Sequence, residues 1–524
     1  MRVIQDMLKK IKPNAQIASS ANVVLCEVAP GELVNLCTKI QKEFSMQLKI
    51  IKATDERKNG KGFRIYYIFG AKGHSQFLAL YLVIKNTDLT FPTLSLDMHE
   101  ATYYELEIHS FFGLVPLHNP ALSQFILHEN VRVDVYPLRK DFKWDTKLEW
   151  VDAPATKFLE VQGEGIYELP VGPVHAGIIE PGHFRFSLAG EEIISLQPKL
   201  GYVHKGSEKL FENLPLDRMV QLSERISGDT SFAHSLAFCQ AIEAMGEVTV
   251  PARAQFLRVI YSELERLANH INDIGFILND TAFAFGGSNG MRLKERIMQL
   301  NDILTGSRFL RDVNMIGGVT KDLQTEQGER IQKALMEIKK DFEECIEIVE
   351  NSETVINRLK KTGALDKQVA IDHGVVGVAA RAIGIPSDSR IDYPYAAYAK
   401  IAPRLALQAT GDVYARYKVR VMEALDAIRI VLEALELLPK GEIISSKELD
   451  LPKNSHSVGI SEGWRGEVVY FVATDQEGKI SRVGVRDPSF LNWPVVPYAV
   501  AGNIVPDFPL INKSFNLSYS GFDR

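Results

Sequence analysis

The fold of this chain is decided by the stretch Glu224-Arg225-Ile226-Ser227-Gly228-Asp229-Thr230-Ser231-Phe232-Ala233-His234-Ser235. Two small hydroxyl residues, Ser227 and Thr230, stand three positions apart in front of a run that turns apolar. Hydroxyls in this position are typical of a turn or a helix start, where they satisfy backbone groups. A second polar stretch closes the chain, Asn516-Leu517-Ser518-Tyr519-Ser520-Gly521-Phe522-Asp523-Arg524, and Ser518 and Gly521 are again three apart.

Neither stretch contains a cysteine. The four cysteines of the chain are Cys26, Cys37, Cys239 and Cys345, and their wide spacing matches no metal-binding pattern. We therefore expect reduced, mostly buried thiols, as in a protein of a reducing compartment.

Composition narrows the class of protein. With 524 residues, 46% hydrophobic and 24% charged, the chain is long enough for more than one domain with a large core. The formal net charge of −6 gives no electrostatic reason to expect nucleic acid as a partner. No apolar run reaches about eighteen residues, and the N-terminus lacks an apolar signal region, so we expect neither a membrane span nor secretion.

The first part of the chain mixes strand-like and helical runs. The segments 63–70 and 76–84 are rich in aromatic and branched residues, and the short polar segment 71–75 between them favours a hairpin. Around 143–165 the sequence becomes polar and irregular, which indicates a domain boundary. We place a small α+β domain at 1–150 and a second domain at 151–524.

Long amphipathic helices dominate the second domain. We expect one helix from Pro251 with an apolar face reaching Ile274, a second from about Glu326 to Lys361, and a third from near Asp412 to just before Pro439. Together they predict a helical bundle. From Gly466 the sequence is strand-like, and 494–509 is Pro-rich. The predicted fold class is α+β, with a small α+β domain followed by a mainly helical domain with peripheral β-structure.

The small domain carries a recognisable motif pair. Its segments 104–114 (Tyr-Glu-Leu-Glu-Ile-His-Ser-Phe-Phe-Gly-Leu) and 137–142 (Pro-Leu-Arg-Lys-Asp-Phe) resemble the signature of the small peripheral-arm subunit of respiratory complex I. They also resemble the matching domain of membrane-bound hydrogenases. Ser110 departs from the aspartate that is usual in that family.

The large domain is similar to the complex I subunit that lines the quinone cavity, and more similar to the large subunit of energy-converting [NiFe]-hydrogenases. The segments that carry this resemblance are, in order, 172–175, 180–185, 201–206, 232–235, 263–270, 486–490 and 523–524. Several distinct motifs in the expected order are far more specific than any one of them. The resemblance implies a hydrogenase-type fold for the second domain.

The same resemblance implies four metal-binding cysteines at positions that here hold Ser227, Thr230, Ser518 and Gly521. Hydroxyls and a glycine are poor ligands for nickel, which prefers soft thiolates in such a site. The alternative is another metal bound by oxygen, for which Asp229 is the only carboxylate between the first two positions, and one carboxylate with two hydroxyls makes a poor site. The chain also stops at Asp523-Arg524, as the complex I subunit does. We expect no metal on this chain.

The resemblance to complex I is incomplete at the quinone site. Gly228 stands where that family has a tyrosine that contacts the quinone headgroup, and glycine has no hydroxyl to donate. Either quinone is not the acceptor, or His175 and His183 in the family's quinone loop hold it; the alternative for each is a hydrogen-bonded loop histidine. Glu180 matches a glutamate that relays protons in hydrogenases, and is otherwise a solvated loop acid.

We assign catalytic roles to Glu180, His175, His183 and Asp229. Arg185 and Arg225 are expected to pair with Glu180, Asp229 or Asp523, and Arg465 resembles the arginine that faces the iron ligands in hydrogenases. The full set expected to line the cavity is Arg185, Arg225, Ser227, Thr230, His234, Arg465, Asp487, Ser518, Gly521, Asp523 and Arg524.

Two functions follow from the resemblance. In the first, the chain is a subunit of a membrane-associated, ion-translocating oxidoreductase of the NADH-quinone oxidoreductase type, at the cytoplasmic face of the membrane. It would receive electrons from a small iron–sulfur partner, contact antiporter-like membrane subunits, and bind quinone or another small acceptor but no cofactor of its own. In the second, it is an inert coupling subunit. An active nickel hydrogenase is excluded by the missing thiolates.

Overall fold

The computed structural model describes residues 2–153, 156–176 and 179–524. The small domain is built on a five-stranded mixed sheet in the order β1-β2-β5-β4-β3. Its elements are α1 (Arg2–Ile11), β1 (Ile17–Ser20), β2 (Val23–Glu27), α2 (Leu33–Phe44), β3 (Gln47–Asp55), β4 (Phe63–Gly70), β5 (Phe77–Ile84), β6 (Thr90–Pro92), α3 (Thr102–Phe112) and β7 (Val115–Leu117). The expected hairpin is confirmed, because β4 and β5 pair antiparallel from Phe63 opposite Ile84 to Gly70 opposite Phe77.

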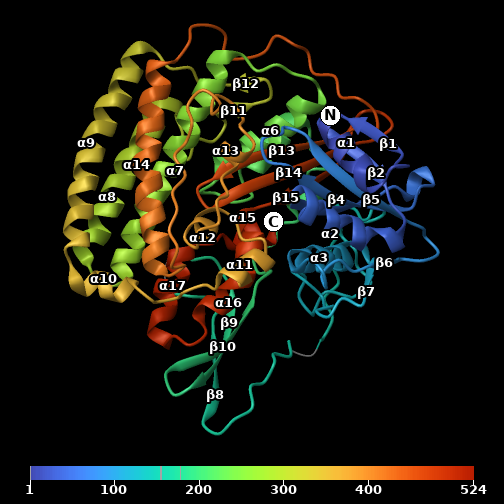
Figure 1. The fold of residues 1–524 in the computed structure, drawn as a ribbon, viewed down its shortest axis with the longest axis horizontal. Coiled ribbons are helices and arrows are strands. Elements are labelled where there is room, and N and C mark those ends of the chain that lie inside the picture. The colour runs from blue at the N-terminus through green and yellow to red at the C-terminus, as the bar shows by residue number, and fades with distance from the viewer. Residues whose placement is uncertain (1, 154–155, 177–178) are drawn as a thin grey trace.

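The polar stretch that follows contains little regular structure. Apart from one isolated bridge between Val131 and Trp150, the described residues between Leu117 and Ile166 form no helix or strand. A three-stranded sheet then projects at one end of the molecule, with β9 (His183–Ala189) between β8 (Ile166–Val171) and β10 (Glu192–Lys199) (Figure 1).

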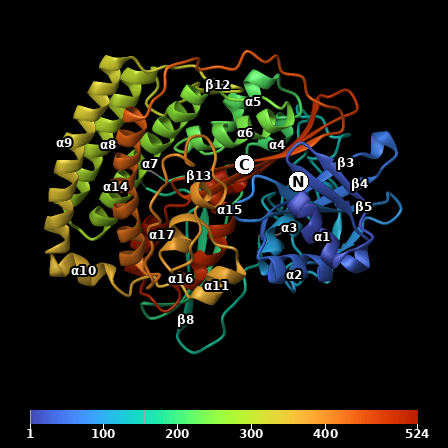
Figure 2. The same ribbon diagram turned by 45° about the horizontal axis from the view of Figure 1, so that its top comes forward.

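The helical bundle of the large domain is centred on α7 (Ala252–Asp280), which begins directly after Pro251 as expected. Around it lie α6 (Ser231–Met245), α8 (Ala284–Thr305), α9 (Thr325–Glu350) and α14 (Val413–Glu436). Figures 1 and 2 show α7, α8, α9 and α14 side by side at one end of the molecule, with the small domain at the other. Gly275 and Gly290 let α7 and α8 approach closely, since a Cβ on Gly290 would lie 2.5 Å from the Cα of Gly275.

The second predicted helix is wrong in its length. α9 ends at Glu350, and a separate helix, α10, runs over Glu353–Leu359. The Asn351 side chain donates to the carbonyl of Glu347 at 2.9 Å, and Ser352 is extended. Short polar side chains of this kind compete with the helical hydrogen bonds and favour a break. The third helix is confirmed, with the Asp412 carboxylate accepting from the N–H of Ala415 at its start.

The strand-like tail forms an antiparallel sheet with β14 (Gly466–Thr474) between β13 (His456–Gly463) and β15 (Ile480–Arg486). Sequence reasoning missed β13. The remaining elements are short: α4 (Ser207–Leu210), α5 (Leu216–Ser223), β11 (Asn314–Met315), β12 (Gly318–Val319), α11 (Lys367–Asp372), α12 (Gly377–Arg381), α13 (Ser389–Asp392), α15 (Pro488–Asn492), α16 (Val496–Val500), α17 (Phe508–Phe515) and α18 (Tyr519–Asp523). The chain therefore ends inside the molecule, where Arg524 is buried.

None of the helices in the described part of the chain combines the length and the apolar composition that a membrane crossing needs.

Buried ion pairs join the two domains. Lys49 of β3 lies 2.9 Å from Glu467 of β14, which Arg486 of β15 also contacts at 2.6 Å. Beside them, Lys52 lies 2.9 Å from Glu208. Because these charges are removed from water, each one depends on its partners for compensation. The small domain is thus fixed against β14 and β15 by polar contacts that tolerate little change.

This arrangement predicts a large cost for Glu467→Gln. The substitution keeps the shape but leaves Lys49 and Arg486 buried without a counter-charge, so we expect a loss of about 3–5 kcal/mol in the free energy of unfolding. The matched control is Glu343→Gln, which breaks an exposed pair with Lys339 and should cost less than about 0.5 kcal/mol. Denaturant unfolding of both variants checks this, and equal stabilities would contradict it.

Candidate functional site

The loop before α6 and the last turn of the chain meet in the core. Ser227 Oγ lies 2.8 Å from Ser518 Oγ, and the N–H of Gly521 donates to that same Ser518 oxygen at 2.9 Å. Thr230 Oγ1 is linked to Ser227 through the carboxylate of Asp229, at 3.0 Å from each hydroxyl. The four positions that the resemblance brings together therefore do lie together.

An ion pair occupies the centre of this site. Arg465, in the turn between β13 and β14, contacts both carboxylate oxygens of Asp229 at 2.6 and 2.8 Å. Its Nε donates to the carbonyl of Asn516 at 2.6 Å, and its guanidinium stacks on the Trp464 ring at 3.9 Å. A two-pronged contact of this kind fixes geometry as well as charge. Arg465 thus ties the α6 loop to the C-terminal segment.

The charge state of Asp229 follows from its neighbours. Burial opposes ionisation of this carboxyl, but Arg465 and the hydroxyls of Thr230 and Ser227 outweigh it and lower the pKa of Asp229 to about 2. The Asp229 side chain is still 38% exposed, whereas Arg465 is only 4% exposed, so the carboxylate faces an opening. At neutral pH the pair is fully ionised.

The residues of the site do not fit a nickel–iron centre. Nickel in such a centre requires thiolates, and the hydroxyls here are already bound to Asp229, to Ser518 or to both. A side chain at Gly521 would place its Cβ 2.5 Å from the Cγ of Asp487. Over residues 2–153, 156–176 and 179–524, no group of three or more His, Cys, Asp or Glu is arranged to hold a metal ion.

His234 and Asp487 form a buried pair beneath the site. His234 Nε2 lies 3.0 Å from Asp487 Oδ2, while its Nδ1 lies 3.0 Å from the Tyr470 hydroxyl. Asp487 also accepts from the N–H of Ser489 at 2.7 Å, where α15 begins. The pair positions the helix that packs on Gly521, and neither residue faces the opening beside Asp229.

The last two residues of the chain fix the C-terminal turn to the rest of the protein. Asp523 accepts from the N–H groups of Gly201 and Val203 at 2.8 and 3.0 Å, and burial raises its pKa to about 6. Arg524 lies 3.2 Å from Glu107 of the small domain and stacks on Phe490. These contacts hold the C-terminal turn, and with it Ser518, in place.

Glu180 reaches the site from the loop before β9. Its Oε2 accepts from the N–H of Ser520 at 3.0 Å, two residues after Ser518. The two predicted loop histidines bind backbone instead: His175 Nε2 lies 2.7 Å from the carbonyl oxygen of Gly182, and His183 Nδ1 lies 3.3 Å from that of Gly172. The catalytic roles of these three residues stay predictions.

The predicted partners of Arg185 and Arg225 are wrong. Arg185 pairs with Glu168 of β8 at 3.0 Å, because the two side chains lie on adjacent strands. Arg225 points outward from the end of α5 and donates to the carbonyl of Gln221 at 2.5 Å. Neither arginine reaches the Asp229–Arg465 pair.

Sequence reasoning missed the roles of three residues near Asp229: Asn269, Trp464 and Glu265. The carbonyl of Asp229 accepts from Asn269 Nδ2 at 3.0 Å and from Trp464 Nε1 at 3.3 Å. The Glu265 carboxylate accepts from the N–H groups of Phe232 and Ala233 at the start of α6, at 2.6 and 3.1 Å. Burial raises the pKa of Glu265 to about 8, so it holds a proton at neutral pH. Glu265 and Asn269 are four residues apart on α7, and this spacing was the available signal that they lie on the same face of the helix.

A cavity of about 230 Å³ opens beside Asp229. Its walls come from α7, α8, α17 and the segment after α8, and its lining is Asp229, Glu265, Ala268, Asn269, Asn272, Phe276, Lys294, Met298, Asn301, Arg308, Phe309, Leu310, Lys513 and Asn516.

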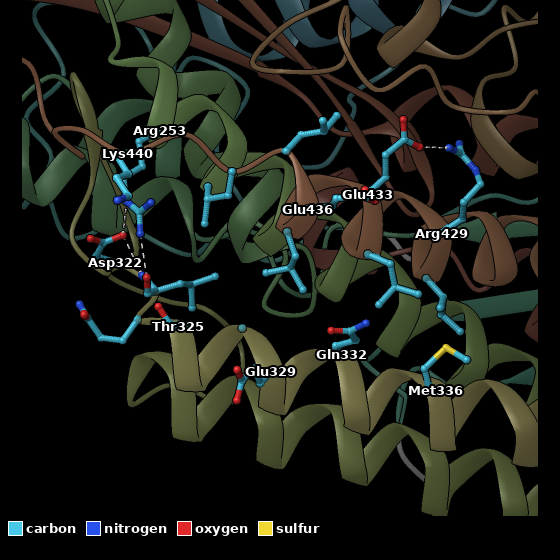
Figure 3. Close-up of a pocket in the computed structure, with 18 of the residues that line it drawn as sticks. Arg253, Asp322, Thr325, Glu329, Gln332, Met336, Arg429, Glu433, Glu436 and Lys440 are labelled. Atoms are coloured by element: carbon cyan, nitrogen blue, oxygen red, sulfur yellow. Dashed lines mark hydrogen bonds and ion pairs between the residues drawn. The ribbon is translucent and has the colours of Figure 1, made fainter.

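A larger groove of about 1310 Å³ lies elsewhere, between α9 and α14. Figure 3 shows its charged rim, where Arg253 pairs with Asp322 at 2.8 Å and Arg429 with Glu433 at 2.7 Å. None of the predicted site residues lines it, so its size does not make it the functional site.

Comparison with known proteins agrees with this architecture. The family described as respiratory-chain NADH dehydrogenase, 30 Kd subunit, matches residues 26–147. The family of the 49 Kd subunit matches 280–459 and 445–524. Formate hydrogenlyase subunit 5 of Escherichia coli is 30% identical, over 91% of this chain and 84% of that protein. NADH-quinone oxidoreductase subunit 4 of Thermus thermophilus is 31% identical, over 74% of this chain and all of that protein.

A solved structure shares the fold. One chain of the membrane-bound sulfane sulfur reductase, described as an archaeal respiratory membrane complex, superposes with a TM-score of 0.65 at 24% identity. The match covers 69% of this chain and 99% of that one. Fold and sequence together define a fused subunit of the complex I and energy-converting hydrogenase type. The chain belongs to the family of the respiratory-chain NADH dehydrogenase 49 Kd subunit, with a 30 Kd-type domain preceding it. The expected resemblance is confirmed.

The geometry predicts a measurable coupling between Asp229 and Arg465. In a double-mutant cycle with Asp229→Asn and Arg465→Met, we expect a coupling energy on the order of 1–2 kcal/mol, below that of a fully buried pair because Asp229 is partly exposed. Since the folded pKa of Asp229 is lowered, this stabilisation is present above the unfolded pKa and is lost as pH falls through about 2.

The control is Arg132 with Asp134, a surface pair in which the guanidinium also contacts both carboxylate oxygens. Denaturant unfolding of the control cycle should give no significant coupling. A coupling for Asp229 and Arg465 no larger than that of the control pair would contradict the assignment.

Proposed function

We propose that this chain is a peripheral subunit of a membrane-associated, ion-translocating oxidoreductase complex. A small iron–sulfur subunit would deliver electrons toward the cavity beside Asp229, and antiporter-like membrane subunits would move the ion. The observation that carries the proposal is the similarity over 91% of the chain to formate hydrogenlyase subunit 5 and to hydrogenase-4 component G. The Thermus relative is named as a subunit of NADH-quinone oxidoreductase, and the structural neighbour is described as part of an archaeal respiratory membrane complex.

The surface of the chain supports docking to partners. Large apolar side chains are exposed within the segment 133–174, among them Val174 at 84%, Val133 at 81% and Leu159 at 80%. Apolar groups exposed in one region are typical of a surface that other subunits cover. We place the complex at the cytoplasmic face of the membrane, with this chain attached through its partners.

In this proposal the chain holds no cofactor and acts through its polar groups. Glu180 sits at the edge of the site as a titratable group bound to the N–H of Ser520, and is suited to pass a proton toward Ser518. Asp229, held in place by Arg465, would orient a small acceptor at the opening. Quinone is one candidate acceptor, although Gly228 offers no hydroxyl, so His175 or His183 would have to bind its headgroup.

A second function is supported by one observation. The hydroxyls of Ser227, Thr230 and Ser518 and the ions of Asp229 and Arg465 all bind one another. A set of polar groups that satisfies itself needs no substrate. The alternative is therefore an inert subunit that transmits conformational change between its partners.

Two conservative variants separate these functions. Glu180→Gln removes a proton carrier and Asp229→Asn removes a charge at the cavity, while both nearly keep shape. With an active cavity, we expect ion transport by membrane vesicles to fall about tenfold or more in each variant. The matched controls are Glu168→Gln, on the neighbouring strand, and Asp217→Asn, at the exposed start of α5.

Assembly of each variant complex is checked by the stoichiometry of its subunits. Full transport in assembled Glu180→Gln and Asp229→Asn complexes would reject the active cavity and leave the coupling subunit.

A further inference from the structure

The cavity beside Asp229 has the size of a small molecule. At about 30 Å³ per water, its volume of about 230 Å³ holds roughly eight waters. Three helices of the large domain, α7, α8 and α17, contribute most of its wall. The chemical character of that wall determines which ligand fits.

Two lysines give the wall a positive charge. Lys294 of α8 and Lys513 of α17 line the cavity, and in the described part of the chain neither ammonium has a carboxylate within 4.0 Å. The Lys513 ammonium lies 4.9 Å from the centre of the Phe276 ring. The third cation, Arg308, differs because Glu295 neutralises it at 2.6 Å.

The acids of the wall do not cancel this charge. Asp229 is compensated by Arg465, which contacts both of its oxygens. Glu265 is bound to the backbone N–H groups at the start of α6 and carries a proton at neutral pH, because burial raises its pKa. Among the charged groups of the lining, Lys294 and Lys513 are therefore the cations without a paired carboxylate, and outside the lining Asp280 and Asp273 offset part of the Lys513 charge at longer range.

The rest of the lining is apolar or amide-bearing. Phe276, Met298, Phe309 and Leu310 supply apolar surface, and four asparagines supply polar groups. The buried Oδ1 of Asn301 has no hydrogen-bond partner in the chain, so it can accept from a ligand hydroxyl or from solvent. Pockets that combine apolar walls with a few placed charges are typical of small-molecule sites.

We propose that this cavity binds a small organic anion, whose carboxylate pairs with Lys294 and Lys513 and whose apolar body packs on Phe276, Met298 and Phe309. This deepens the proposed function by naming the class of ligand that the opening beside Asp229 accepts. It rests on the proposed function only for the claim that the ligand is acted on, since binding itself requires no partner subunit and no transport.

Benzoate and benzamide are the matched probes, because they share size and an aromatic body and differ in charge. Calorimetry on the purified full chain should show benzoate binding at least about tenfold more tightly than benzamide. Lys294→Gln and Lys513→Gln should each lower the affinity for benzoate by roughly tenfold, since each removes one charge-assisted contact. The affinity for benzamide should stay unchanged in both variants. Lys513→Arg keeps the charge and should retain the preference.

The control variant is Lys440→Gln, which removes a cation from the groove between α9 and α14 and should leave benzoate binding unchanged. Thermal unfolding of each variant verifies that it is folded.

Equal affinity for the two probes in the unmodified chain would overturn the proposal, as would an equal loss of benzoate affinity in Lys440→Gln. If the lysine variants instead reduce copurification of a partner subunit and benzoate does not bind, the cavity takes an acidic side chain of that partner, which also overturns it. If benzoate binds but transport is absent, the proposed function fails and this inference stands. If transport is present but benzoate does not bind, this inference fails and the proposed function stands.

Discussion

The contact between Asp229 and Arg465 is the interaction on which the functional site depends. It joins the loop before α6 to the turn between β13 and β14, and through Asn516 to the last turn of the chain. The resemblance to hydrogenases implies a metal held by four thiolates between these segments. Here an ion pair and three hydroxyls make the connection, so the scaffold keeps its shape without soft ligands.

The site is embedded in a core unusually rich in buried charge. Arg266, Arg381, Arg390, Arg416 and Arg420 are each at most 2% exposed, and most have a carboxylate partner. The seam between the domains is also built on buried ion pairs, of Lys49 with Glu467 and of Lys52 with Glu208. Buried pairs add little net stability, but they penalise any arrangement that separates them. Such a core fixes the position of the cavity relative to both domains.

The local features of the fold could be predicted from sequence because their signals are local. The β4–β5 hairpin, the start of α7 after Pro251 and the Asp412 cap of α14 each depend on a few neighbouring residues. The site was predictable only in part. The order of the motifs predicted that Ser227, Thr230 and Ser518 lie close together. Arg465 and Asp229 are 236 positions apart, and nothing in their local sequence shows that they pair. The same holds for Arg185 and Arg225, whose partners are set by strand pairing and by the end of α5.

Nickel analysis of the purified complex tests the central claim most directly. If the ion pair of Asp229 and Arg465 has replaced the metal, elemental analysis should find nickel far below stoichiometric amounts and the complex should not oxidise hydrogen, even when it is produced in a cell that loads nickel hydrogenases. About one nickel per chain would contradict the account, because no set of thiolates is available to hold it.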